Sequence, residues 1–495
     1  MEVREIQVEA DVSDGLPSFA MVGFPSAQVR EAQERVRTAF KNNRLCLPPK
    51  KVTVNFAPAD MKKEGAGFDL PVAAAVLAAA GILEPDLLEG VMIVGEISLN
   101  GEIHGVAGVL PRVIRAREMG LRFCVIPEEN IREGNLVKDM PVFGVKSLND
   151  MIRCLRDPNT YTNEYQEKEK TENKPEKPNV DFADICGQEG ARRAAEIAVS
   201  GFHNILFIGP PGSGKTMLAR RLPTIMPEMT FEESLEITKV YSVAGLLTEK
   251  DPLIRQRPFR SPHHTSSPQA LAGGGRIPGP GEITLAHRGV LFLDEMPEFS
   301  RKSLEILRQP LEDGYVTISR VQASLTFPAN FIMCTAQNPC PCGYLGDKKR
   351  ECSCKQFEIE RYHRKLSGPL LDRIDLQVYV PRLEYADLQS REAGESSAVI
   401  RERVIKARQL QLLRLQGTNL YCNEQMGRRE LNKHCQMEAA AEKLLAKFFT
   451  ALGLSARSHD RIIKVARTIA DLDGSDIITA AHLAEAVQLR TSLNS

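Results

Sequence analysis

The 495 residues of the chain are enough for about three domains, and its hydrophobic and charged contents of 42% and 26% are ordinary for a globular protein. The 64 basic and 64 acidic side chains cancel. The composition therefore excludes a protein that binds nucleic acid through an overall positive charge, and any such contact requires a local basic surface.

Three further features bear on where the protein works. The longest apolar run, residues 70–83, is rich in alanine and too short to cross a bilayer. Glu2, Arg4 and Glu5 stand where a signal peptide has a basic start followed by apolar residues. The eleven cysteines are an odd number without a secretion signal, which does not favour disulfides. We expect a cytoplasmic protein that makes no membrane contact.

Residues 1–155 have the pattern of an α/β domain. Helical periodicity covers residues 70–80 and 110–119, and Asn100-Gly101 is typical of a tight turn between two strands within residues 94–103. Alternating or continuous apolar runs predict further strands at residues 51–56, 91–94 and 123–126.

Part of this domain resembles the proteolytic domain of Lon-type proteases, a ribosomal S5-like α/β fold, in residues 63–80 and 94–120. Those enzymes cleave peptides with a serine activated by a lysine of lowered pKa. Aligned on the hairpin, the position of the family's lysine falls on Leu110, and that of its serine falls within residues 64–67, which contain no hydroxyl. We therefore do not expect peptide hydrolysis. The resemblance implies an interaction or assembly domain, because a fold does not carry its chemistry with it.

Residues 156–180 differ sharply in composition from their surroundings. Asp, Asn, Glu, Lys, Thr and Pro dominate, and aliphatic side chains are missing from residues 156–179. Such a segment cannot bury enough apolar surface to offset its ordering entropy, which predicts a flexible linker. A functional charged tail is the alternative.

The segment from Gly209 to Thr216 follows an apolar run at residues 204–208 and precedes a helical segment at residues 217–222. Strand, glycine-rich turn and helix in this order predict a phosphate-binding loop, since backbone N–H groups converge on phosphates in front of the positive helix end. Lys215 is expected to reach the β- and γ-phosphates of ATP, and the Thr216 hydroxyl to ligate Mg²⁺. An ordinary turn is the alternative. The expected nucleotide-binding residues are Gly209, Pro210, Pro211, Gly212, Ser213, Gly214, Lys215 and Thr216.

Two more apolar strands end in polar residues suited to hydrolysis. Residues 289–293 lead into Asp294 and Glu295, expected to hold Mg²⁺ and to polarise the attacking water, respectively. Residues 330–336 end near Asn338, whose amide is suited to orienting that water. The alternatives are a strand followed by a polar turn and an unrelated loop asparagine.

These three strands, in this order and spacing, resemble the AAA+ ATPases, and residues 367–376 resemble the segment that bears the arginine finger in the branch containing magnesium chelatases and MCM helicases. The resemblance implies a homohexameric ring in which Arg373 reaches the γ-phosphate bound by the neighbouring subunit. Arg457 fits the second sensor of these enzymes, and Arg461 is the competing candidate. A surface ion pair with a nearby aspartate is the alternative role for Arg373.

Four cysteines form two tight pairs: Cys340, Cys342, Cys352 and Cys354. Four thiols at this spacing suit a tetrahedral, structural Zn²⁺ site, although Cys-x-Cys is tighter than the commoner Cys-x₂-Cys. Reduced thiols on an irregular loop are the alternative.

Two segments are candidates for DNA contact. Residues 312–320 and 322–327 predict a hairpin with Arg320 near its tip, which resembles the channel hairpins of the MCM-like branch; a solvated hairpin is the alternative. Residues 255–276 form a second basic and flexible stretch, in which His263-His264 is interpreted as part of a polar loop facing the channel or substrate, with a metal site as the alternative.

Nearly the entire chain resembles the ComM/YifB family of magnesium-chelatase-like ATPases, through residues 257–264, 338–343 and 466–472 together with the N-terminal domain. The resemblance implies an AAA+ core at residues 181–382, helical residues 383–495, and a hexameric helicase that promotes branch migration when transforming DNA is integrated by homologous recombination. The implied partners are single-stranded and branched DNA and a recombinase or other recombination protein. The alternatives are the ATPase subunit of a magnesium chelatase, against which the N-terminal domain and the cysteines count, and an ATP-switched recombination scaffold.

Overall fold

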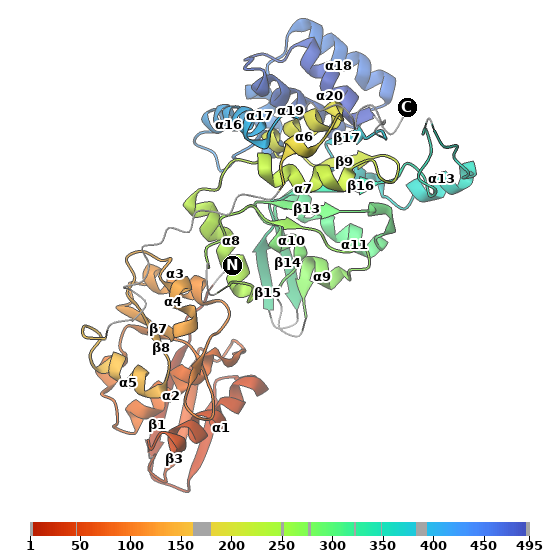
Figure 1. Cartoon of the computed structure of the whole chain (residues 1–495). Helices are drawn as coiled ribbons and strands as arrows, with labels where there is room; N and C mark the ends of the chain where they lie inside the picture. Colours follow the sequence, from red (N-terminus) through yellow and green to blue (C-terminus); the bar gives the residue numbers. More distant parts are fainter. Residues whose placement is uncertain are drawn as a thin grey trace.

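The computed structural model describes residues 3–45, 47–161, 180–248, 252–275, 279–320, 323–347, 349–382 and 394–491. An N-terminal α/β part, a central part around a parallel sheet, and a group of C-terminal helices follow one another along the molecule (Figure 1). The predicted α/β fold class is confirmed. Most of the predicted linker, residues 156–180, lies outside the described residues. Among the described helices, none combines the length and the apolar character needed to cross a membrane.

The N-terminal part contains two three-stranded sheets. In the first, β3 (Lys51–Ala57) lies between the antiparallel β1 (Gln7–Ser13) and the parallel β2 (Ser18–Val22). The second is parallel, in the order β4 (Val91–Ile93), β7 (Phe123–Pro127) and β8 (Val142–Val145). The helices of this part are α1 (Ala27–Asn42), α2 (Asp69–Ala79), α3 (Val109–Glu118), α4 (Ile131–Gly134) and α5 (Leu148–Arg156).

The local predictions for this part are confirmed to within one or two residues. The expected strands and helices are β3, β4, β7, α2 and α3, and the expected hairpin is the antiparallel pair of β5 (Glu96–Ile97) and β6 (Ile103–His104). Gly101 has a φ of +88°, which explains the glycine in its turn. Leu110, the position of the Lon-type lysine, is completely buried. β1 was not predicted from the sequence, although its alternation of polar and apolar residues is typical of a strand.

The central sheet has five parallel strands in the order β10-β13-β16-β9-β17. Their bounds are β9 (Ile205–Ile208), β10 (Phe259–Arg260), β13 (Val290–Leu293), β16 (Ile332–Gln337) and β17 (Leu376–Tyr379). Parallel strands end at the same edge of a sheet, so the polar residues that follow β9, β13 and β16 lie close together.

Both faces of this sheet are buried, which explains why its strands are continuously apolar. Phe207, Phe292 and Cys334 belong to a core with α6, α7, α16 and α19, whereas Leu206, Leu293 and Met333 belong to the core on the opposite face. The helices around the sheet are α6 (Glu189–Gly201), α7 (Lys215–Ile225), α8 (Phe231–Val243), α9 (Pro268–Ala272), α10 (Glu282–Leu285), α11 (Arg301–Glu305), α12 (Pro310–Asp313), α13 (Gln356–His363) and α14 (Gly368–Leu371).

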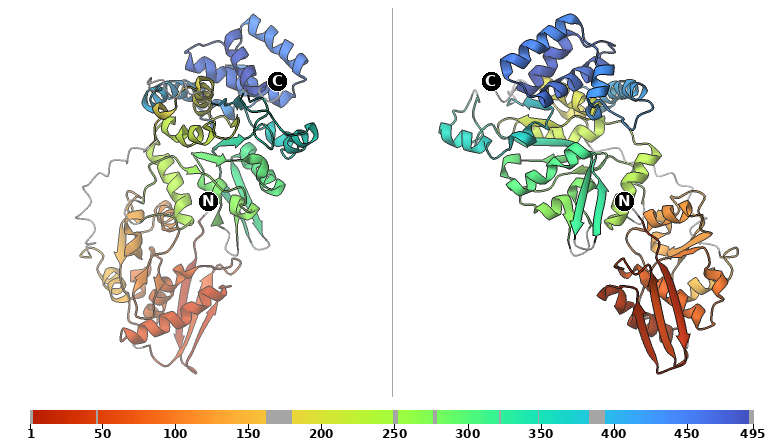
Figure 2. Two further views of the ribbon diagram at one scale, coloured as in Figure 1. Left: turned by 45° about the vertical axis from the view of Figure 1, so that its right-hand side comes forward. Right: turned by 180° about the vertical axis from the view of Figure 1, so that it is seen from behind.

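The predicted hairpin between β13 and β16 is present as the antiparallel pair β14 (Tyr315–Arg320) and β15 (Ala323–Pro328). It projects from the core on the side away from the C-terminal helices (Figure 2). Residues 321–322, at its tip, lie outside the described residues.

The C-terminal helices are α16 (Ser397–Arg414), α17 (Arg428–His434), α18 (Ala439–Leu452), α19 (Ala456–Leu472) and α20 (Ala480–Thr491). The Ser455 side chain caps α19 by accepting from the backbone N–H of Ser458, and Gly453 ends α18 in a left-handed conformation. The predicted helical character of this region is confirmed.

Candidate functional site

The loop from Gly209 to Thr216 joins β9 to α7, as strand, turn and helix. Gly212 and Gly214 have φ values of +78° and +91°, so the loop needs a left-handed conformation that glycine adopts without strain. Lys215 is buried at the first position of α7, and its ammonium group donates to the carbonyl oxygens of Gly209 and Pro210 at 2.7 and 2.9 Å. The loop therefore closes around the head group of its own lysine.

Lys215 also connects the loop to the next strand of the sheet. Its Nζ lies 3.3 Å from Oδ1 of Asn338, which follows β16 directly. Burial lowers the pKa of Lys215 to about 8, and the carboxylates of Asp294 and Glu295 partly oppose this shift. The lysine, the asparagine and both carboxylates thus face one another.

Asp294 and Glu295, which follow β13, have different neighbours. The Thr216 hydroxyl donates to Oδ2 of Asp294 at 3.0 Å, so the two predicted magnesium ligands are adjacent. Glu295 has a φ of +52°, which is unusual for a residue other than glycine and is often found at functional sites. Its side chain is 56% exposed and lies 3.9 Å from Nδ1 of His264. Of the two predicted histidines, His264 therefore lies beside the expected base.

One cleft of about 450 Å³ brings these groups together. Of the residues predicted for the nucleotide site, Gly209, Pro210, Arg373 and Arg457 do not line this cleft. Its lining residues are Pro211, Gly212, Ser213, Gly214, Lys215, Thr216, Met217, Asp294, Glu295, Gln337 and Asn338. Hydroxyl, ammonium, carboxylate and amide groups converge there as phosphate and Mg²⁺ binding require. The residues fit a nucleoside triphosphate with its metal ion.

Gln337 was not predicted from the sequence. Its side chain is 1% exposed, and neither its amide nitrogen nor its oxygen has a hydrogen-bond partner within the described part of the chain. Buried polar groups are normally paired, so this amide is available to a ligand in the cleft. Its only signal in the sequence is its place at the end of the strand before Asn338.

Gln188, which was also missed, positions the phosphate loop. It has a φ of +59° and lies just before α6. Its Nε2 donates to the carbonyl oxygens of Ser213 and Pro381 at 2.7 and 3.0 Å, which ties the loop to the residues after β17.

Arg373 and Arg457 lie in a second cleft, of about 170 Å³. Glu312 forms ion pairs with both, and its contact with Arg457 measures 3.3 Å. These arginines lower the pKa of Glu312, chiefly through the hydrogen bond from Arg373. Over the described residues, this cleft has no lining residue in common with the first. The structure therefore places the predicted finger and sensor together, and both outside the cleft of their own phosphate loop.

The competing candidate, Arg461, lines the same second cleft but is engaged deeper in the protein. It pairs with Asp375, a completely buried carboxylate at the start of β17. Arg461 thus joins the C-terminal helices to the central sheet, whereas Arg457 remains 64% exposed.

The four cysteines of the predicted metal site are also together. Sγ of Cys340 lies 3.3 Å from that of Cys342 and 3.6 Å from that of Cys352, and the four sulfur atoms all lie within 4.8 Å of one another. Across the described residues, no other group of three or more histidine, cysteine or acidic side chains has the geometry of a metal site. The metal alternative for His263-His264 has no such support.

The prediction of a flexible basic stretch at residues 255–276 is wrong for two of its arginines. Arg257 pairs with Glu233 at 2.9 Å, and Arg260 donates to both carboxylate oxygens of Glu282 at 2.7 Å. Glu233 lies on α8 and Glu282 on α10, and they are 24 and 22 residues away from their arginines in the sequence. The two arginines hold helices in place and are not free to bind phosphates.

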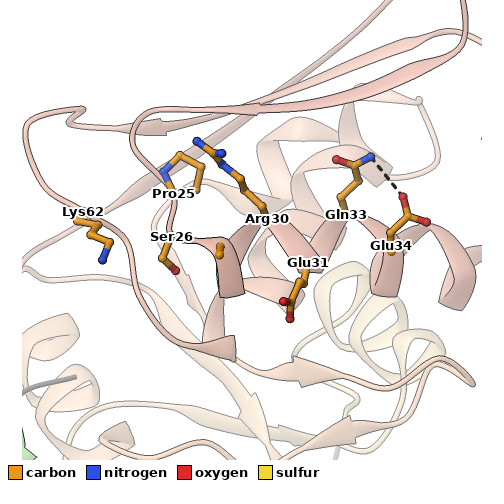
Figure 3. A pocket seen from close by; sticks show the side chains of 8 residues that line it. Pro25, Ser26, Arg30, Glu31, Gln33, Glu34 and Lys62 are labelled. Carbon is orange, nitrogen blue, oxygen red and sulfur yellow. Dashed lines mark hydrogen bonds between the residues drawn. The ribbon is translucent and has the colours of Figure 1, made fainter. Parts of the chain in front are cut away.

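A larger open groove, of about 570 Å³, lies in the N-terminal part along α1 (Figure 3). Among its labelled side chains, Gln33 donates a hydrogen bond to Glu34 (Figure 3). Ser26 caps α1 by accepting from the N–H of Val29, and Lys62 pairs with Glu64 at 2.6 Å. The serine and lysine of this groove therefore have other partners, and nothing here replaces the missing protease dyad.

Three family profiles match the chain. Residues 8–130 match the one described as "Subunit ChlI of Mg-chelatase", residues 181–388 "Magnesium chelatase, subunit ChlI", and residues 394–490 "Magnesium chelatase, subunit ChlI C-terminal".

Two individual relatives are similar over nearly the whole chain, and a third is similar over a shorter stretch. The competence protein ComM of Haemophilus influenzae is 44% identical over 488 residues, covering 98% of this chain and 94% of that protein. The protein YifB of Escherichia coli is 41% identical over 487 residues, with the same coverage of 98% and 94%. The magnesium-chelatase 67 kDa subunit of Chlorobaculum parvum is 25% identical over 164 residues, which are 32% of this chain and 23% of that subunit.

Proposed function

The chain belongs to the ComM/YifB family of magnesium-chelatase-like AAA+ proteins, and from this premise we propose that it is a cytoplasmic, ATP-driven DNA helicase. It forms a homohexameric ring that moves along DNA and shifts branched junctions during homologous recombination, including the integration of transforming DNA. The relative ComM carries the name competence protein, which supports a role with transforming DNA. The observation that carries the proposal is the separation of the phosphate-loop cleft from the cleft of Arg373 and Arg457.

In the first cleft, the chain's own residues bind and orient the triphosphate. The N–H groups of the loop and the start of α7 face the phosphates, and Lys215 exchanges its two loop carbonyls for phosphate oxygens. Thr216 and Asp294 hold Mg²⁺, which neutralises charge on the phosphate oxygens when bound. The binding of the nucleotide therefore also frees the loop from its lysine.

Hydrolysis requires a positioned water molecule. Glu295 polarises this water as general base, and Asn338 orients it from the end of the adjacent strand. The unpaired amide of Gln337, beside Asn338, provides a further hydrogen-bonding group on the same wall of the cleft.

The second cleft completes the site of a neighbouring copy. Arg373 and Arg457 offer two guanidinium groups to the γ-phosphate held in the first cleft of that copy, and Glu312 neutralises them until then. Two different surfaces that meet head to tail generate a ring when the rotation closes. The ring then hydrolyses ATP only at subunit boundaries.

The traction on DNA is assigned to the β14–β15 hairpin. It is directly connected to Glu312, because α12 ends at Asp313 and β14 begins at Tyr315. A hairpin that moves with bound DNA therefore pulls on the carboxylate that holds the arginine finger. Six hairpins around a channel concentrate basic side chains locally, although the net charge of the whole chain is zero.

The test is ATP hydrolysis and unwinding of forked DNA by the purified protein. Single-stranded DNA is expected to raise the hydrolysis rate, and Lys215→Ala to abolish both activities. Lys447→Ala removes an exposed lysine of α18 and serves as the control, with both activities retained. A protein that hydrolyses ATP but neither binds nor remodels DNA contradicts the helicase proposal.

A magnesium-chelatase ATPase subunit is the second candidate, favoured by the descriptions of the three matching profiles. Because one of them matches residues 8–130, the N-terminal domain does not count against this candidate as the sequence suggested. DNA-independent hydrolysis, together with metal insertion into a porphyrin when partner subunits are added, would favour it.

The variant Glu295→Gln distinguishes the proposed helicase from a scaffold that binds ATP and needs no hydrolysis. This variant is expected to bind ATP with the wild-type Kd and to lose roughly 10²- to 10⁴-fold in hydrolysis rate, since it lacks the general base. A motor then stalls on forked DNA. Full recombination activity in the same variant would instead identify a scaffold.

A further inference from the structure

We propose that Cys340, Cys342, Cys352 and Cys354 bind one Zn²⁺, and that this ion sets the rate of ATP hydrolysis by holding the turn at residues 338–343 against the phosphate loop. The inference rests on the proposed ATP hydrolysis for its second half only. Its first half, a bound metal, is measured independently of any activity.

The sulfur geometry fits a mononuclear tetrahedral site. Zinc–sulfur bonds of about 2.3 Å place the sulfur atoms of a tetrahedron about 3.8 Å apart. The Sγ atoms of Cys340, Cys342 and Cys352 lie 3.3 to 3.6 Å from one another, and Sγ of Cys354 accepts from the N–H of Cys342 at 3.3 Å. These separations exceed the roughly 2.05 Å of a disulfide bond by far. Without a bound ion, the thiols are expected to lie slightly closer together than the roughly 3.8 Å of a zinc-bound tetrahedron.

Four thiolates determine the kind of metal and its role. Soft sulfur ligands in a tetrahedron select zinc or iron over magnesium and calcium. Because the protein supplies four ligands, no coordination position is open for water or substrate, so the ion is structural. Cys340 is completely buried, which keeps one side of the site closed to solvent.

The turn between Asn338 and Gly343 touches the phosphate loop directly. Gly343 has a φ of +86°, and its N–H donates to the carbonyl oxygen of Cys340 at 2.9 Å. A Cβ atom on Gly343 would lie 2.6 Å from Cδ of Pro211 and 3.8 Å from Cγ of Asn338. The contact therefore leaves no room for a methyl group.

The same turn carries Asn338, which orients the water in the proposed reaction and lies 3.3 Å from Lys215. After β16 ends at Gln337, the next regular element is α13, which begins at Gln356. Two of the four cysteines come from each end of this interval, so one ion ties both ends together. Metal binding supplies the ordering free energy that such a short loop cannot obtain from a core. Without zinc, Asn338 and Pro211 lose their common support.

The first experiment measures metal in the purified full-length chain by mass spectrometry. About one zinc per chain is expected for wild type and for Cys435→Ala, a cysteine of the C-terminal region outside the cluster. Cys352→Ser combined with Cys354→Ser is expected to contain less than a tenth of that amount. Zinc-free wild-type protein, iron in place of zinc, or a Cys340–Cys342 or Cys352–Cys354 disulfide overturns the assignment of the metal.

The second experiment tests the contact with a variant that keeps all four thiols. Gly343→Ala inserts a methyl group against Pro211, whereas Gly346→Ala is the matched control, since Gly346 also has a positive φ (+76°) but nothing within 4 Å of its Cβ position. Both variants are expected to retain zinc and the wild-type melting temperature to within a few degrees. Gly343→Ala is expected to lower kcat for ATP about tenfold or more with Kd for a fluorescent ATP analogue changed less than threefold, and Gly346→Ala to leave both unchanged.

Equal ATPase rates in the two glycine variants, both with zinc bound, would overturn the control of hydrolysis by the turn. A wild-type protein that contains zinc but hydrolyses no ATP would instead contradict the proposed function, because the metal assignment would stand.

Discussion

The two clefts of the central part differ in how they are built. The phosphate-loop cleft draws on the ends of three neighbouring strands and already contains a lysine, two hydroxyls, two carboxylates and two amides. The cleft of Arg373 combines α12, the residues after α14, and α17 and α19, and it lacks a phosphate loop. The first cleft has the phosphate loop but neither arginine, and the second has Arg373 and Arg457 but no phosphate loop. The proposal that two copies of the chain complete one catalytic site rests on this difference.

Arg373→Ala should have the largest effect on this comparison. An arginine supplied by a neighbour is worth about 10³- to 10⁵-fold in hydrolysis rate, so loss of that order is expected while ATP binding in the other cleft remains. Arg364→Ala, which removes an exposed arginine from the end of α13, is the control and should hydrolyse ATP normally.

Mixing Arg373→Ala protein into wild-type protein sharpens the test. Each dead subunit disables the site of its neighbour, so the rate should fall faster than the fraction of wild-type subunits. A strictly linear fall with dose would mean that each copy works alone, and the division of the site between copies would be wrong.

A change of pH should act on the first cleft alone. Burial lowers the pKa of Lys215 to about 8, so below this pH the ammonium group is already present and ATP affinity should be constant. Above it the free lysine is neutral and must take up a proton to bind phosphate, so Kd should rise about fivefold between pH 8 and pH 9 and about tenfold for each pH unit beyond. Fluorescence titration of an ATP analogue measures this. Lys215→Arg, whose charge does not titrate, should show a flat profile over the same range.

Glu312→Gln should have the smallest effect and the opposite sign. Half-exposed ion pairs contribute about 1 kcal/mol or less, so freeing Arg373 and Arg457 should raise the DNA-free hydrolysis rate by no more than about fivefold. The stimulation by DNA should shrink accordingly. Asp313→Asn removes the adjacent exposed charge and should leave both rates as they are. A lower rate in Glu312→Gln would show that the carboxylate supports the finger instead of restraining it.

The residues that could be predicted from the sequence share one property: their partners are close along the chain. The phosphate loop is recognised because strand, glycines and lysine are contiguous, and Asp294 because it directly ends an apolar strand. Asn100-Gly101 indicates its hairpin for the same reason. The four cysteines lie within fifteen residues of one another, so their pairing into one cluster was also within reach.

Other features depend on partners that are distant in sequence. The sequence alone predicts a flexible basic stretch at residues 255–276, but Glu233 and Glu282 form ion pairs with Arg257 and Arg260. Gln337 became a candidate only because no described residue forms a hydrogen bond with its side-chain amide.

By itself the sequence determined the α/β fold class, the phosphate loop, the place of Asp294 and Glu295 at the end of an apolar strand, and the four-thiol cluster, because hydrophobic periodicity and short motifs act over a few residues. Only the tertiary structure decided that Arg373 and Arg457 both form ion pairs with Glu312, and that Gly343 packs against Pro211. Close packing brings together groups more than a hundred residues apart, and no local pattern records which of them will meet.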